Sequence, residues 1–318
     1  MNAFPSGTGV AIVAPGGYAP DEAGLQRALD RLAAQGCVVR NYYQHGARHH
    51  RFGATDEERA AQLHDAARDP AVQVVIALRG GYGMSRLLPR LDFRLLAESG
   101  KLFVGHSDIT ALHMGLLCQQ GAASFAGPMI CDDFTLDETS DFTMRHFRNC
   151  IGHAECKVEA VLPDGAPDNP VLGCEGVLWG GNLSMLTHLM GTPYLPVIDG
   201  GILFVEDVNE HPYRVERMLL QLLHGGVLAR QQALVLGDFS NYRLSDYDNG
   251  YDFNAMLAWL RREVEIPIVC GLPFGHIRDK ATLAVGAMAR LETDARGLRL
   301  GMRGYPFLRP EQPDRRLP

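Results

Sequence analysis

The sequence lacks any apolar run near the roughly 20 residues that a membrane-spanning helix needs. Its first fifteen residues contain no lysine or arginine, and the apolar run from Val10 to Ala14 is too short for the core of a signal peptide. We interpret that run as the first strand of a sheet. These absences predict a protein of the cytoplasm that does not act at a membrane.

The chain also lacks the common motifs for disulfides, metals and phosphates. Its 7 cysteines are scattered and include no Cys-x-x-Cys pair, which predicts reduced thiols. No His-Glu-x-x-His or Cys/His cluster is present, and Asp246, Asp248 and Gly250 resemble a calcium loop only faintly, because its later glutamate is missing. A net charge of -7 argues against a nucleic-acid partner. We therefore expect no metal, no cofactor and no nucleic-acid partner.

What the sequence does contain is an alternation of apolar strands and amphipathic helices in its first half. Strand patterns separated by helical ones indicate a parallel sheet with helices on both faces. The expected strands are residues 9–14, 37–41, 72–78 and 102–104, and the main helices between them are residues 21–35 and 56–67. The fold class is therefore α/β, beginning with an N-terminal parallel-sheet domain.

A polar, proline-containing stretch at residues 162–170 is typical of a domain linker. We predict an N-terminal α/β domain over residues 1–160, a linker over 161–175 and a C-terminal mixed α/β domain over 176–318. In the last of these, residues 282–302 alternate like paired antiparallel strands.

Ser107 stands between the apolar strand 102–104 and an amphipathic helix, within Gly105-His106-Ser107-Asp108. A strand, tight turn and helix in this order lift a serine hydroxyl outward and aim helix N–H groups at the atom that it attacks, as in a nucleophile elbow. Ile109 replaces the second glycine of the usual Gly-x-Ser-x-Gly motif. Taken alone, the segment equally fits a serine that caps a helix.

A serine nucleophile needs a base and a group that orients the base. His276 lies in a loop just past the expected strand 266–270, and Glu206 ends the buried strand 202–205. A carboxylate at such a position is held by a specific partner or has a perturbed pKa. The alternatives are that His276 is a surface residue and that Glu206 caps the helix beginning near Pro212.

The loop Arg79-Gly80-Gly81-Tyr82-Gly83 directly follows the buried strand 72–78. Its glycines let backbone N–H groups approach a ligand closely. A phosphate cradle is one interpretation, although Arg86 occupies the place of the third glycine in Gly-x-Gly-x-x-Gly. Because a candidate nucleophile lies on the neighbouring turn, we favour a second interpretation, in which the loop supplies half of an oxyanion hole. A plain tight turn is the third interpretation.

Together and in order, these segments resemble the LD-carboxypeptidases (muramoyltetrapeptide carboxypeptidases), a serine peptidase family that includes the microcin C immunity proteins. The resemblance spans nearly the whole chain and includes Gly127-Pro128-Met129, residues 178–183, residues 206–217 and Phe274-Gly275-His276. It implies Ser107 as the nucleophile, Glu206 and His276 as its triad partners, and the N–H groups of Gly81 and Asp108 as the oxyanion hole.

The resemblance further implies cleavage of the amide between an L-centre of a diamino acid and a terminal D-alanine in murein tetrapeptides, as in peptidoglycan recycling, by a protein that forms a homodimer. Arg79, Tyr82 and Trp179 are candidates for substrate contacts, with Arg86 and Arg214 as further cations for the terminal carboxylate. Two alternatives remain: an amidase that inactivates peptidyl-nucleotide toxins through the same triad, and a non-catalytic protein whose two lobes bind a peptide.

Overall fold

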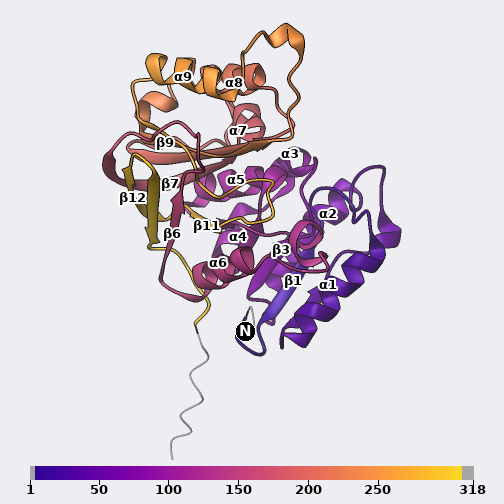
Figure 1. Cartoon of the computed structure of the whole chain (residues 1–318). Coiled ribbons are helices and arrows are strands. Elements are labelled where there is room, and N and C mark those ends of the chain that lie inside the picture. Colours follow the sequence, from indigo (N-terminus) through magenta and orange to yellow (C-terminus); the bar gives the residue numbers. More distant parts are fainter. Residues whose placement is uncertain (1–3, 310–318) are drawn as a thin grey trace, which may run out of the picture.

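Two β-sheets form the framework of the computed structural model, which describes residues 4–309 (Figure 1). The first sheet has the strand order β11-β5-β4-β3-β1-β2. Its strands are β1 (Gly9–Val13), β2 (Val38–Asn41), β3 (Val74–Ala77), β4 (Leu102–Gly105), β5 (Ser124–Ala126) and β11 (Leu283–Val285). The helices of this half are α1 (Glu22–Ala34), α2 (Asp56–Arg68), α3 (Met84–Leu87), α4 (Phe93–Glu98), α5 (Thr110–Gln120) and α6 (Asp141–Gly152).

Strands β1 to β5 of this sheet are parallel to one another, and the sequence predicts this arrangement for β1 to β4. Every residue of β1, β3 and β4 is buried, which explains their continuous apolar character. The chain steps from β1 outward to β2 and then crosses back to β3 on the other side of β1. Because such crossovers are right-handed, α1 covers one face of the sheet and α2, α4 and α5 cover the other. The predicted doubly covered α/β fold is confirmed.

The second sheet has the order β10-β9-β8-β7-β12-β13-β6 and is mixed. Strands β7 to β10 are parallel, whereas β12 is antiparallel to β7 and to β13, and β13 is antiparallel to β6. The strands are β6 (Glu155–Val161), β7 (Leu172–Asn182), β8 (Gly201–Val208), β9 (Gln231–Ser240), β10 (Ile268–Val269), β12 (Met288–Asp294) and β13 (Gly297–Arg303). Its helices are α7 (Leu183–Leu189), α8 (Pro212–His224) and α9 (Phe253–Glu263), of which α9 is orange in Figure 1.

Two segments pair with the sheet of the other half of the chain. Strand β6, which begins within the range 1–160 and ends at Val161, pairs with β13 of the second sheet, and β7 begins within the range 161–175. Strand β11, from the C-terminal half, extends the first sheet by pairing antiparallel with β5. The predicted alternation at residues 282–302 therefore contains three strands. β12 and β13 form a hairpin in the second sheet, whereas β11 joins the first sheet. Within residues 4–309, no helix is both long and apolar enough to cross a membrane.

Candidate active site

The serine elbow forms as the sequence predicts. Strand β4 ends at Gly105, His106 is extended, and Ser107 adopts a left-handed backbone conformation with φ 61° before the helical turn that leads into α5. A non-glycine residue rarely adopts this conformation, and it persists only where the surrounding structure imposes it. The turn leaves Ser107 partly exposed while its neighbours His106 and Asp108 are buried.

The glycine loop after β3 packs directly against Ser107. A Cβ atom on Gly80 would lie 2.9 Å from the Cβ and 3.0 Å from the Oγ of Ser107, and 3.3 Å from the backbone nitrogen of Asp108. The Gly80 carbonyl also accepts a 3.0 Å hydrogen bond from the N–H of Gly17, in the loop after β1. Strands β1 and β3 flank the point where the strand order reverses, which is where ligands bind in sheets of this type.

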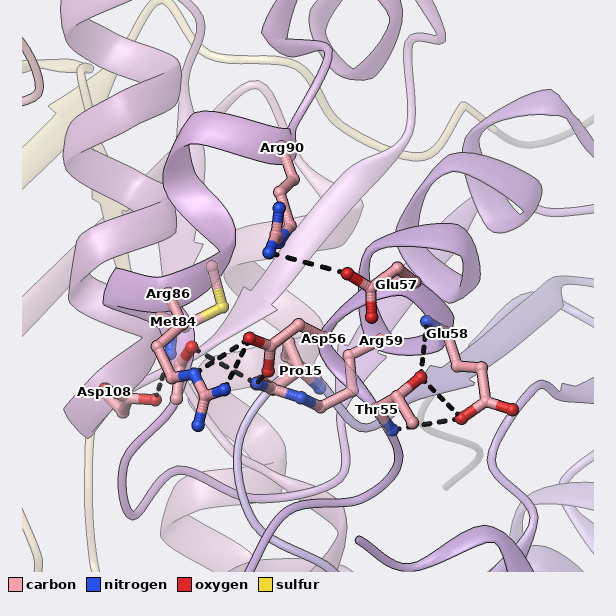
Figure 2. Close-up of polar contacts among 11 residues, drawn as sticks. Pro15, Thr55, Asp56, Glu57, Glu58, Arg59, Met84, Arg86, Arg90 and Asp108 are labelled. Carbon is pink, nitrogen blue, oxygen red and sulfur yellow. Dashed lines mark hydrogen bonds and ion pairs between the residues drawn. The ribbon is translucent and has the colours of Figure 1, made fainter.

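Arg59 of α2 links the loop after β1 to the glycine loop through hydrogen bonds (Figure 2). Its guanidinium is completely buried and donates hydrogen bonds to the carbonyl oxygens of Pro15 and Gly83, the latter at 3.2 Å. A 2.5 Å ion pair to Asp56 balances its charge, and the ring of Phe52 lies 4.5 Å from the guanidinium carbon. The glycine loop is thus fixed by contacts that leave its outer edge open.

Asp108, directly after Ser107, braces the same loop through its side chain (Figure 2). Its Oδ2 accepts a 2.9 Å hydrogen bond from the N–H of Met84, and its Oδ1 is buried without a partner among the described residues. Burial raises the pKa of Asp108 to about 6, although the Met84 N–H and the Arg59 guanidinium oppose the change. The carboxylate faces α3, so the backbone N–H is the group of Asp108 that remains for a substrate.

Glu206 and His276 meet as a hydrogen-bonded pair. Glu206 lies on β8 and is completely buried, and its Oε2 accepts a 2.7 Å hydrogen bond from Nδ1 of His276. This bond places the proton of a neutral imidazole on Nδ1 and leaves Nε2 as the basic atom. Gly275 permits the approach, because it has φ 142° and a Cβ there would lie 3.3 Å from Oε2 of Glu206.

Asn182, at the end of β7, is the residue of this site that sequence reasoning assigned no role. Its Nδ2 donates to Oε1 of Glu206 at 3.2 Å and to Oδ1 of Asp207 at 3.0 Å. Its N–H donates to Oγ1 of Thr110 on α5, and its Oδ1 caps α7 by accepting from the N–H of Met185. Asn182 therefore fixes the carboxylate that holds His276 and links it to the helix that follows Ser107.

Electrostatics favour the protonated form of His276. Burial acts to lower the pKa of His276, but the hydrogen bond and charge of Glu206, with the charges of Asp132 and Asp207, outweigh it and raise the pKa. A carboxylate that stabilises an imidazolium in this way is the arrangement that a general base needs when it takes a proton from serine.

The turn that contains Ser107 lies close to the loop that contains His276. The ring of His106, the residue before Ser107, lies 5.3 Å from the ring of His276, and both line a cleft of about 760 Å³. The other lining residues are Cys131, Asp132, Leu136, Asp137, Glu138, Ile277, Arg278 and Lys280. The cleft thus combines residues of both halves of the chain.

Comparison with known proteins identifies the family. Residues 10–127 match the LD-carboxypeptidase N-terminal domain, and residues 175–291 match the LD-carboxypeptidase C-terminal domain. The chain belongs to the LD-carboxypeptidase family. It is accordingly a serine-type peptidase, as predicted from the sequence.

Three known proteins resemble more than nine-tenths of the chain. A Bacillus subtilis protein named "Probable murein peptide carboxypeptidase" is 32% identical over 92% of this chain and 91% of its own length. The crystal structure of muramoyltetrapeptide carboxypeptidase from Oxalobacter formigenes is 56% identical, with a TM-score of 0.89 over 94% of this chain and 100% of that one. The microcin C7 self-immunity protein MccF, in complex with aspartyl sulfamoyl adenosine, is 22% identical with a TM-score of 0.84 over 96% of this chain and 99% of that one, and shares the fold.

The other predicted site residues of this LD-carboxypeptidase lie in different environments, and one of them lies away from the cleft. Arg79 begins the glycine loop, and its Nε is buried without a partner among residues 4–309. Tyr82, on the same loop, is 43% exposed. Trp179 is not brought to the cleft: it is buried on β7, its indole N–H donates to Gln231, and it lines a separate pocket.

The alternative candidates have partners of their own. Arg86 forms a 2.7 Å ion pair with Asp56, and Arg214 pairs with Glu210 at 2.5 Å on the surface of α8. Arg79 is therefore the cation of the three that remains for a substrate carboxylate. No group of three or more candidate metal ligands occurs among the described residues.

Proposed function

We propose that this protein is a serine LD-carboxypeptidase that releases the terminal D-alanine of murein tetrapeptides. The observation that carries the proposal is the buried Glu206 that holds His276 through a 2.7 Å hydrogen bond, beside the strained turn that presents Ser107. The 56% identity to a muramoyltetrapeptide carboxypeptidase over 94% of the chain supports the choice of substrate.

In the proposed reaction, Nε2 of His276 removes the proton of Ser107 as its Oγ attacks the carbonyl of the diamino acid. The carbonyl becomes a tetrahedral oxyanion. His276 then gives the proton to the nitrogen of the departing D-alanine, which leaves an ester on Ser107. Water, deprotonated by His276, attacks the ester, and the serine regains its proton as the shortened peptide leaves. Glu206 stabilises the imidazolium in both steps.

The oxyanion would be bound by the N–H groups of Asp108 and Gly81. The packing of Gly80 against Ser107 supports this assignment, because it sets the two strand ends side by side. The hydrogen bonds found among residues 4–309 include none from the N–H of Gly81, and its Cβ position faces open space. A donor of this kind contributes about 3–4 kcal/mol to stabilising the transition state.

The test is release of D-alanine from the peptide L-Ala-γ-D-Glu-meso-diaminopimelate-D-Ala, with the same peptide ending in L-alanine as a control. We expect release from the first peptide alone, and loss of release in Ser107→Ala and His276→Ala variants that retain the wild-type melting temperature. If the wild type released alanine from neither peptide, the proposal would be contradicted, and a peptidyl-adenylate would be the next substrate to test. Full activity in Ser107→Ala would assign the nucleophile elsewhere.

A further inference from the structure

The cleft beside His276 has an acidic wall whose only part in the site described so far is the effect of the charge of Asp132 on the pKa of His276. Three side chains of this wall, Asp132, Asp137 and Glu138, are exposed, and none forms an ion pair with another described residue. Of the two cations in the cleft, Lys280 is buried and paired with Asp133 at 2.7 Å. The other, Arg278, donates to the backbone oxygen of Glu138 rather than to a carboxylate.

The acidic wall is held in place from behind. Arg31 of α1 donates to the backbone oxygens of Phe134 and Leu136, each at 2.8 Å, and to that of Asp137 at 3.1 Å. Because this guanidinium binds main-chain carbonyls, it positions the segment without pairing with its carboxylates. The negative charge is therefore left facing the cleft in a segment that is already ordered, which lowers the entropy cost of binding a cation.

His106 adds a hydrogen-bond acceptor to the same cleft. It is 1% exposed, and its Nδ1 lies 2.9 Å from the carbonyl oxygen of Gly127, which can only accept, so Nδ1 carries the proton. Burial, together with the charges of Lys280 and His276, holds the pKa of His106 well below its usual range. The ring is thus neutral, and its Nε2 has a lone pair for which no donor exists among the described residues.

We propose that this cleft is a subsite for a substrate ammonium group, which donates to Nε2 of His106 and is balanced in charge by Asp132, Asp137 and Glu138. The proposal rests on the proposed function, in which the residue that supplies the acyl group is a diamino acid. The ring of His106 lies 5.3 Å from that of His276, so the subsite adjoins the reacting carbonyl. That position suits the side chain next to the scissile bond better than the distant N-terminus of the peptide.

The subsite gives the enzyme a chemical criterion for its substrate. An ammonium group can satisfy both the lone pair and the negative wall, whereas an acylated amine has lost the charge and two of its three donors. A side chain without the amine would leave the acceptor of His106 desolvated and unpaired, which is costly. The enzyme is therefore selective for peptides whose side-chain amine is free.

The test compares D-alanine release from four tetrapeptides: the diaminopimelate peptide, its 2-aminopimelate analogue that lacks only the distal amine, the peptide acylated on that amine, and the peptide acetylated at its N-terminus. For the wild-type enzyme, we expect kcat/KM to be about 10- to 100-fold lower on the second and third peptides than on the first, mainly through a higher KM. On the fourth peptide, kcat/KM should equal that on the first. Asp132→Asn and His106→Phe reduce this discrimination, and Asp164→Asn, in the exposed segment 162–170, preserves it.

Equal rates for wild type on the diaminopimelate and aminopimelate peptides would overturn the subsite alone, because release from the first peptide upholds the proposed function. A loss caused by N-terminal acetylation instead of side-chain acylation would also overturn it. Release from none of the four would overturn the proposed function and the subsite with it. Asp132 is exposed, so its variant tests the proposal even if His106→Phe does not fold.

Discussion

Replacing Glu206 by glutamine keeps the size of the side chain and removes only its charge and one acceptor. The amide oxygen can still accept from Nδ2 of Asn182, which now lies 3.2 Å from Oε1. The amide nitrogen then faces Nδ1 of His276 and can only donate. This favours the imidazole tautomer that carries its proton on Nε2, and that tautomer cannot accept the proton of Ser107.

The expected loss in kcat is about 10⁴-fold, the size found when a triad carboxylate is replaced by its amide in a serine peptidase, which corresponds to roughly 5.5 kcal/mol in the activation barrier. The pH dependence should change as well. In the wild type, Glu206 raises the pKa of His276 against the effect of burial. Without the carboxylate burial remains, so the pKa falls and the acidic limb of the residual activity moves to lower pH.

The same substitution makes a prediction about stability. A histidine whose folded pKa is raised contributes stability that is fully present below its unfolded pKa and is lost as the pH rises through the folded pKa. The wild type should therefore exceed Glu206→Gln in unfolding free energy by more at acidic than at alkaline pH. At alkaline pH the variant buries no unpaired charge, because His276 is neutral, so we expect only a small difference there.

The assay is D-alanine release and urea unfolding of both proteins from about pH 5 to about pH 9, a range that spans the titration of histidine. Glu98→Gln is the matched control, since Glu98 is 64% exposed and, within residues 4–309, forms its ion pair with Arg94 on its own helix. Activity of Glu206→Gln within about tenfold of the wild type, a difference of only ~1.4 kcal/mol in the barrier, would refute the triad role of this carboxylate. An unchanged acidic limb would refute its electrostatic effect on His276.

Three further substitutions test other parts of the site. Gly80→Ala should lower kcat by about 100-fold or more with little change in melting temperature, because a Cβ 2.9 Å from that of Ser107 must displace the nucleophile; normal kcat would contradict this packing. Lys280→Met should lower the free energy of unfolding in urea by about 3–5 kcal/mol, because it leaves the carboxylate of Asp133 buried and unpaired, and adding Asp133→Asn should recover part of the loss. Asp108→Asn should stabilise the fold by roughly 3 kcal/mol above pH 6 and by little near pH 4, because the cost of a pKa raised from 3.8 to about 6 builds up between these two pH values, as the unfolded group ionises while the folded group stays protonated. Equal stabilisation at both pH values would show that the charge of Asp108 is not the cause.

Local patterns in the sequence predicted the parts of the structure that depend on neighbours in the chain. Apolar runs predicted β1 to β4 of the first sheet, and the segment around Ser107 predicted a tight turn between β4 and α5, where Ser107 has φ 61°. The pairing of Glu206 with His276 also agrees with the sequence-based hypothesis. In each case a strand end limits where the side chain can lie, so the sequence position carries spatial information.

The features that the sequence did not predict depend on contacts between distant segments. Asn182 follows a glycine pair at the end of β7 and looks like a helix cap, a role that it does have. Its bonds to Glu206 and Asp207 arise because β7 and β8 are adjacent and parallel, which no local pattern reveals. Trp179 illustrates the converse, since an aromatic residue near the motifs proved to be buried with Gln231.

The pairing of β11 with the first sheet explains how His276 and His106, the residue before Ser107, come to line the same cleft. The segment from Phe274 to β11 leaves the second sheet, where the Phe274 carbonyl accepts from the N–H of Asp238, and ends on β5 of the first. Between these two attachments it carries His276, and Lys280 joins it to Asp133 in the first half through a buried ion pair. A substitution that loosens β11 or the Lys280 pair therefore acts on the base as well as on the fold. The position of His276 and the docking of the two halves therefore depend on one short stretch of chain.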